Sequence, residues 1–120
     1  METARLTIRK HKESAEAVED EFVLDGGIPY AVVPQDVLKR LGVEPDDTVT
    51  FLVGMETISR RVGDAYIQFG RRGGYSKVIF GEPGDMKQLG VRTLEALGLL
   101  LHPFTRELLP LPSTVLVMAS

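Results

Sequence analysis

Glycine and proline recur at short intervals from Gly26 onward, and the segments between them form only short apolar or β-prone runs. Glycine favours turns and proline removes a backbone hydrogen-bond donor, so each interruption limits the length of a strand or helix. Apolar residues have helical spacing in segments 35–41 and 91–97, and each segment is followed by a glycine that can end a helix. The sequence therefore predicts a mostly β fold, a barrel or a sandwich, with two short helices.

Period-two alternation and β-prone residues place the expected strands. They are residues 6–9, 21–24, 30–33, 48–53, 57–62, 65–69, 77–80, 99–101, 107–109 and 115–118. Segments 48–53 and 57–62 flank Gly54 and are expected to form an antiparallel hairpin. The charged segment 10–20 is expected to be an exposed connection, and the glycine-rich residues 70–74 are expected to form a turn.

The composition excludes several kinds of chemistry. A chain of 120 residues has the size of one domain, so residues 1–120 are expected to form a single unit. The chain has no cysteine and two histidines, which excludes disulfides, a thiol nucleophile and cysteine-ligated metals. We therefore expect no cofactor and no metal site. A formal net charge of −3 and a pI near 5.4 argue against nucleic acid as a partner.

The sequence also leads to an expectation about location. Apolar runs such as residues 97–101 are far shorter than the ~20 residues that cross a bilayer. Residues 1–5 lack the basic and then apolar order of a signal peptide. We expect a cytoplasmic protein without a membrane partner.

Asp25, Gly26 and Gly27 stand between two β-prone segments. Taken alone, Asp-Gly at such a position predicts a tight hairpin turn, because glycine supplies the positive φ that a type I′ turn requires. Without cysteine, and with few histidines, any catalysis must rest on carboxylates, hydroxyls or backbone groups. A functional interpretation of Asp25 therefore depends on the residues around it.

Those residues resemble a known family. Residues 22–34 read FVLDGGIPYAVVP and residues 37–43 read VLKRLGV. This order resembles the active-site segment of retropepsin-like (clan AA) aspartic proteases, in which an apolar strand runs into Asp-Thr/Ser-Gly-Ala. A second apolar strand follows there, and then a proline and a short helix that ends in Leu-Gly.

The resemblance continues along the chain to about residue 112. Segments 58–63 and 65–69 are similar to the strands that follow the family's flap, the hairpin that covers the substrate. Residues 89–99, LGVRTLEALGL, are similar to a helical segment of the bacterial and archaeal predicted aspartyl proteases. Pro103 and residues 108–110 fall where those proteins place further proline motifs. The resemblance implies a retropepsin-like barrel with two short helices and one lobe per chain.

The resemblance also implies a mechanism and a partner. Aspartic proteases activate water between two carboxylates that share one proton. This chain offers only Asp25 in an Asp-x-Gly context, so a complete site requires a homodimer that brings two copies of Asp25 together. Gly27 allows a tight turn beneath the carboxylate. The substrate is expected to be a peptide or protein held as an extended strand in a cleft under the flap residues Val53, Gly54 and Met55.

Several residues depart from the family pattern. Gly26 stands where the family has Thr or Ser, whose hydroxyl braces the two active-site loops, and residues 53–55 replace the flap motif Ala-Asp-Gly. Gln88 replaces a leucine, and His102 stands where Asp is usual. These departures keep open a second hypothesis, a non-catalytic dimeric module that binds peptides or proteins on the same scaffold. For the dimer interface, the end segments 6–9 and 115–118 are the candidates.

A second resemblance covers about twenty residues. Residues 33–53 are similar to an AbrB-type swapped-hairpin DNA-binding module. It leaves Asp25 and everything after residue 62 unexplained, so we rank it third among the function hypotheses. The basic pairs 60–61 and 71–72 are interpreted as solvated turn arginines, and Glu82 and Asp85 as turn residues.

Overall fold

The computed structural model describes residues 2–111, and within them the chain is mostly β with two short helices, as expected. The elements are β1 (Thr3–Arg9), β2 (Val18–Leu24), β3 (Ala31–Pro34), α1 (Gln35–Arg40), β4 (Asp47–Val53), β5 (Glu56–Phe69), β6 (Arg72–Gly81), β7 (Gln88–Leu89), α2 (Val91–Ala96), β8 (Leu99–Leu101) and β9 (Leu108–Pro110). None of the helices in this part of the chain is long and apolar enough to cross a membrane.

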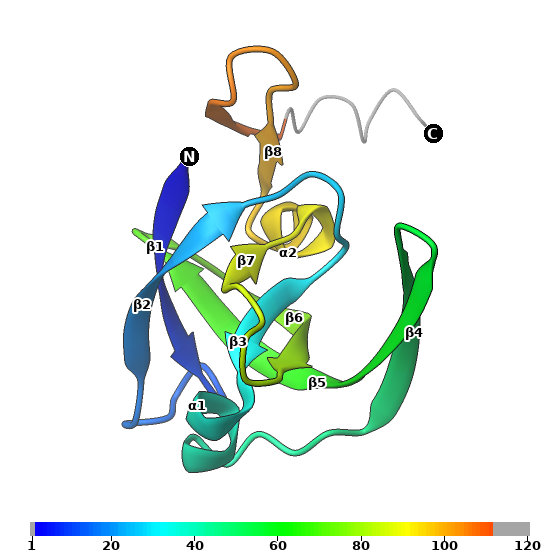
Figure 1. Cartoon of the computed structure of the whole chain (residues 1–120). Helices are drawn as coiled ribbons and strands as arrows, with labels where there is room; N and C mark the ends of the chain where they lie inside the picture. The colour runs from blue at the N-terminus through cyan, green and yellow to red at the C-terminus, as the bar shows by residue number, and fades with distance from the viewer. Residues whose placement is uncertain (1, 112–120) are drawn as a thin grey trace, which may run out of the picture.

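Seven strands form one sheet in the order β1-β2-β7-β3-β6-β5-β4. β1 pairs with β5 as well as with β2, so the sheet folds back on itself. β7 runs parallel to β2 and antiparallel to β3, and it separates these two strands although they follow each other in sequence. The β4–β5 hairpin curves away from the rest of the sheet, and β8 and β9 form a separate two-stranded sheet (Figure 1).

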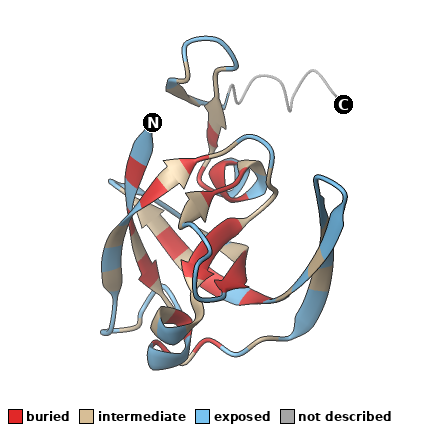
Figure 2. Cartoon of the chain, viewed as in Figure 1, coloured by how far each residue is buried: buried red, intermediate tan, exposed pale blue. Residues whose placement is uncertain are grey.

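The core lies inside the curved sheet and is covered by the two helices. Alternate residues of β1, such as Leu6 and Ile8, are fully buried there, as the period-two pattern predicts. α1 contributes Leu38 and α2 contributes Leu94 to the same apolar cluster. Buried residues therefore gather in the body of the molecule, whereas the β4–β5 hairpin is mostly exposed (Figure 2).

Strand β2 is longer than the sequence predicted. β2 begins at Val18, inside the segment 10–20 that was expected to be an exposed connection. Its first residues alternate between exposed and partly buried positions, and the exposed Glu19 and Glu21 both pair with Arg5 on β1. In the sequence this alternation was not evident, because acidic residues that pair with the neighbouring strand occupy these positions. The expectation of an exposed connection was therefore wrong for residues 18–20.

Glycines that were expected to break strands lie inside them instead. β5 is continuous through Gly63, and a side chain there would approach the carbonyl oxygen of Glu44 to 2.5 Å. β6 includes Gly73 and Gly74, which were expected to be part of a turn. A Cβ at Gly73 would collide with the ring of Tyr66, so this glycine serves close approach rather than chain reversal.

The two segments expected at a dimer interface have different outcomes. Leu6 and Ile8 belong to the chain's own core, so the apolar face of β1 is not available to a partner. The expected strand 115–118 lies outside the described residues.

Candidate functional site

Asp25 follows the last residue of β2 and begins the loop that leads to β3. Its backbone N–H donates to the carbonyl of Leu89, 3.2 Å away, so the loop is tied to β7 at its first residue. β2 and β3 do not pair with each other, because β7 lies between them. The type I′ hairpin turn predicted from Asp-Gly alone is therefore wrong, and neither Gly26 nor Gly27 has a positive φ.

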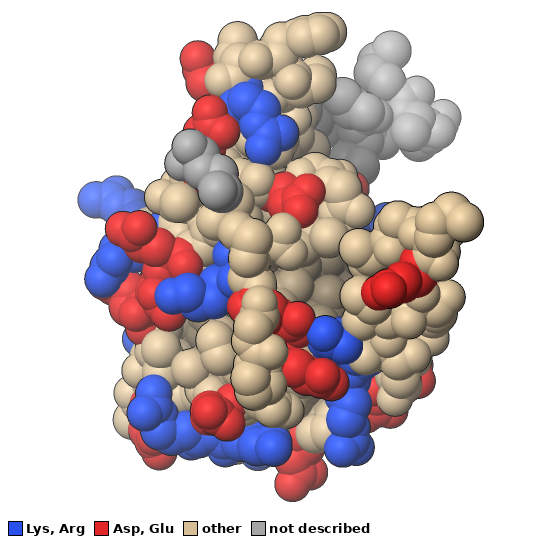
Figure 3. Space-filling view, in the orientation of Figure 1, with Lys and Arg blue, Asp and Glu red and all other residues tan. Residues whose placement is uncertain are grey.

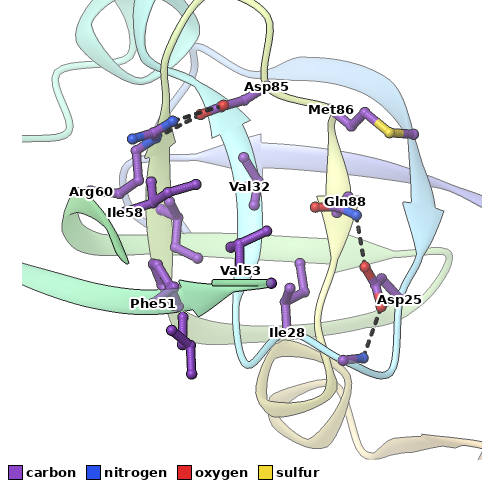
Figure 4. Close-up of a pocket in the computed structure, with 14 residues that line it drawn as sticks. Asp25, Ile28, Val32, Phe51, Val53, Ile58, Arg60, Asp85, Met86 and Gln88 are labelled. Atoms are coloured by element: carbon purple, nitrogen blue, oxygen red, sulfur yellow. Dashed lines mark hydrogen bonds and ion pairs between the residues drawn. The ribbon is translucent and has the colours of Figure 1, made fainter. Parts of the chain in front are cut away.

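The side chain of Asp25 is partly buried and both of its carboxylate oxygens accept hydrogen bonds. The backbone N–H of Gly27 donates to Oδ1 over 2.8 Å, and the side-chain amide Nε2 of Gln88 donates to Oδ2 over 2.7 Å. Gln88 lies on β7, so this contact joins residues that are 63 positions apart in sequence (Figure 4). The sequence singled out Gln88 only as a departure from an apolar motif and did not place it at the carboxylate.

Asp25 lies in a cleft of about 490 Å³ between the body of the molecule and the β4–β5 hairpin. Apolar side chains line the middle of the cleft, between Asp25 at one end and Arg60 with Asp85 at the other. Ile28 and Val32 come from the body, and Phe51 and Ile58 come from the hairpin (Figure 4). Figure 3 shows the hollow beside the hairpin, with acidic and basic side chains next to each other at its lower end. The cleft therefore offers a carboxylate beside an apolar surface.

The three residues expected in the flap lie at the tip of the β4–β5 hairpin. Val53 pairs with Glu56 across a two-residue loop, and Gly54 has a φ of +62°, as the first loop residue of a type II′ turn does. Val53 and Gly54 line the cleft. Met55 does not line it and is 99% exposed at the hairpin end.

An ion pair stands at the other end of the cleft from Asp25. The guanidinium of Arg60 on β5 donates to both carboxylate oxygens of Asp85, over 2.7 and 2.9 Å, and the Glu82 backbone N–H also donates to Asp85. The Arg60 guanidinium holds the pKa of the Asp85 carboxyl below its ordinary value of 3.8. The interpretation of Arg60 as a solvated turn arginine is therefore wrong, because Arg60 lies on β5 and its side chain is only 18% exposed. Asp85 is a turn residue as predicted, since its backbone N–H donates to the carbonyl of Glu82, and its side chain also binds Arg60.

Among the described residues, Asp85 is the only other carboxylate that lines the cleft, and it is held by Arg60. One chain therefore presents one acidic group, Asp25, whose oxygens are held only by uncharged amide donors. Gly26, next to it, has open space where a side chain would project. No protein-family model matches the chain, and no curated protein matches it at a significant level.

Proposed function

We propose that this chain is one half of an aspartic endopeptidase, in which two copies each contribute Asp25 to a shared site. The observation that carries the proposal is the position of Asp25, with both carboxylate oxygens held in a cleft beneath an exposed β hairpin. A hairpin with an apolar inner side is suited to cover an extended peptide, which can pair with a strand edge. β4 has such an edge, because it pairs with β5 alone among the described strands.

The chemistry requires two carboxylates and a water molecule. The ionised Asp25 takes a proton from water while the water oxygen bonds to the peptide carbonyl carbon, and the protonated Asp25 of the second copy gives its proton to the carbonyl oxygen. When the tetrahedral intermediate collapses, the C–N bond breaks and the amine nitrogen takes the proton from the first Asp25. One hydroxyl of the intermediate gives its proton to the Asp25 of the second copy, which restores the starting state. Two carboxylates that lie within reach of one water molecule repel each other when both are ionised, so the proposed pair shares one proton.

The proposal includes a retropepsin-like fold, with the sheet closed as a barrel. The pairing of β1 with β5, through Thr7 opposite Gln68, supports closure. In this arrangement β7 lies between β2 and β3 and ties the loop of Asp25 to a strand from the C-terminal half of the chain.

Sizing combined with peptide cleavage tests the proposal. We expect a dimer that cleaves members of a peptide pool at about pH 4–6. Asp25→Asn should reduce cleavage to background, whereas Asp36→Asn, an exposed carboxylate on α1 outside the cleft, should retain it. Cleavage by a monomer, or cleavage that survives Asp25→Asn, would contradict the two-chain site.

A second candidate function is a non-catalytic dimer that binds peptides in the same cleft. It is favoured by Gly26, which carries no hydroxyl to brace the two loops against each other and has open space beside it. This candidate predicts a dimer that binds peptides without cleaving them. A third candidate, DNA binding by residues 33–53, is less favoured because Leu38 of that segment is fully buried in the main core. It predicts retention on DNA that salt abolishes.

A further inference from the structure

The contact between Gln88 and Asp25 takes no direct part in the bond-making steps of the proposed chemistry. Nε2 of Gln88 is 2.7 Å from Oδ2 of Asp25, and both side chains are partly buried. An ionised carboxylate can only accept hydrogen bonds, so the Gln88 amide must present its NH₂ group to it. In Figure 4 the amide oxygen of Gln88 then points away from Asp25, toward the side of the cleft that holds Val32.

The backbone at Gln88 is held from both sides. Gln88 lies opposite Val23 of β2 and opposite Val32 of β3. The strand is also fixed on each side of Gln88, because Val23 donates to the carbonyl of Lys87 and Asp25 donates to that of Leu89. The side-chain amide of Gln88 therefore reaches Asp25 from a backbone that is held in place.

We propose that Gln88 is a positioning residue for Asp25: its amide holds Oδ2 while the Gly27 N–H holds Oδ1, which fixes the plane of the carboxylate before any substrate binds. The inference rests on the proposed function for its catalytic consequence, but the contact itself does not. A charge-assisted hydrogen bond of this kind is stronger than one between neutral groups. The family pattern has a leucine at position 88. A leucine side chain has no hydrogen-bond donor, so Oδ2 of Asp25 would bind only water and the carboxylate could rotate.

The contact can be tested without any activity, by NMR of the side-chain amides in the full chain. The Gln88→Met variant identifies the Gln88 amide signals, because they disappear from its spectrum. We expect these signals to move in Asp25→Asn. The amide of Gln68, which accepts from Arg9 outside the cleft, should not move in that variant. Gln88 signals that are identical in the wild type and in Asp25→Asn would overturn the inference.

Kinetics test the consequence for the reaction. Gln88→Met keeps the length of the side chain and removes the donor, so kcat should fall about tenfold or more, with KM within about twofold of the wild type. Gln68→Met makes the same substitution outside the cleft and should leave both constants unchanged. A kcat for Gln88→Met equal to that of the wild type would overturn the positioning role.

Gln88→Glu gives a readout that a merely structural role would not move. Its carboxylate repels Asp25 when ionised, but its neutral form carries an O–H that can donate to Oδ2 in the same place. Activity of this variant should therefore recover as pH falls, more steeply than that of Gln88→Met. A pH profile parallel to that of Gln88→Met would contradict the inference. If the wild type cleaves nothing but the NMR signals respond to Asp25→Asn, the proposed function fails and the contact stands.

Discussion

The two halves of β5 lie in different surroundings although they belong to one continuous strand. Residues 56–61 pair only with β4 among the described strands, and most of their side chains are exposed. Residues 63–69 pair with β6, and three of them also pair with β1, so that Ala65 and Ile67 are fully buried. The first half forms the hairpin that covers the cleft, and the second half belongs to the core.

This difference concentrates the stabilising contacts in one half of a single strand. The burial that stabilises the fold is concentrated in the second half, because only there does the strand have neighbours on both edges and a covered face. The first half lacks these contacts, so its hydrogen bonds open at a lower free energy. The hairpin can therefore open while the part of the molecule that holds Asp25 stays folded.

The largest expected effect comes from matched isoleucine truncations in the two halves. Ile67→Ala removes a fully buried side chain and should lower the free energy of unfolding by about 2–5 kcal/mol. Ile58→Ala, on the same strand but partly exposed beside the cleft, should lower it by about 1 kcal/mol or less. Urea unfolding of the two variants measures both values. Equal losses would show that the hairpin is as firmly packed as the core.

A smaller effect is expected at the junction of the two halves. A Cβ at Gly63 would lie 2.5 Å from the carbonyl oxygen of Glu44 and 3.2 Å from the ring of Phe80. Gly63→Ala should therefore lower the free energy of unfolding by about 1–3 kcal/mol, because the backbone of β5 must shift. Gly26→Ala, which meets no atom within 4 Å, is the matched control and should leave stability nearly unchanged. A Gly63→Ala protein as stable as the wild type would mean that the backbone at Gly63 and Glu44 can move apart at little cost in free energy.

The smallest effect is expected from the ion pair that ties the hairpin to the loop before β7. The pKa of Asp85 is lowered by Arg60, so this pair stabilises the fold above pH ~4 and its contribution is lost as pH falls through the lowered pKa. Asp85→Asn should lower stability at pH 6 by about 1 kcal/mol and weaken the fall of Tm between about pH 4 and pH 2.

Hydrogen exchange assigns this effect to one region. Asp20 also has a pKa lowered by an ion pair, because Lys87 donates to it over 2.8 Å in the body of the molecule. Asp85→Asn should speed the exchange of hairpin amides, whereas Asp20→Asn should not. Faster exchange of the hairpin in both variants would show that the ion pair of Arg60 has no special role there.

The sequence predicted those parts of the fold in which the local pattern agrees with the final contacts. The hairpin of β4 and β5 has alternating β-prone residues around Gly54, and each helix is followed shortly after its last residue by a glycine with positive φ, Gly42 or Gly98. These features depend on neighbours in sequence, so the sequence alone is sufficient to place them.

Other parts depend on contacts between distant residues. β7 has only two residues, Gln88 and Leu89, which is too short for any periodicity to reveal. The sequence also cannot tell a glycine that turns the chain from one that allows close approach, which is why the roles of Gly63 and Gly73 were missed.

The candidate site was predicted in the same uneven way. The resemblance placed Asp25, Val53 and Gly54 in one site, and all three line the same cleft in the structure. Asp25 and Gly54 lie in loops and Val53 is the last residue of β4. The resemblance did not bring Gln88 or the pair of Arg60 and Asp85 to that cleft, because each of these contacts is made by side chains whose partners only the folded sheet selects.

The insertion of β7 between β2 and β3 has a consequence for synthesis of the chain. Asp25 leaves the ribosome 63 residues before Gln88, and until β7 arrives the gap between β2 and β3 has no strand to fill it. Pairings between residues so far apart form late in folding, since a long loop must first close. A nascent chain that has not yet reached β7 therefore carries the carboxylate without the strand and the amide that orient it, so the cleft can assemble only after residues 88–89 have been made.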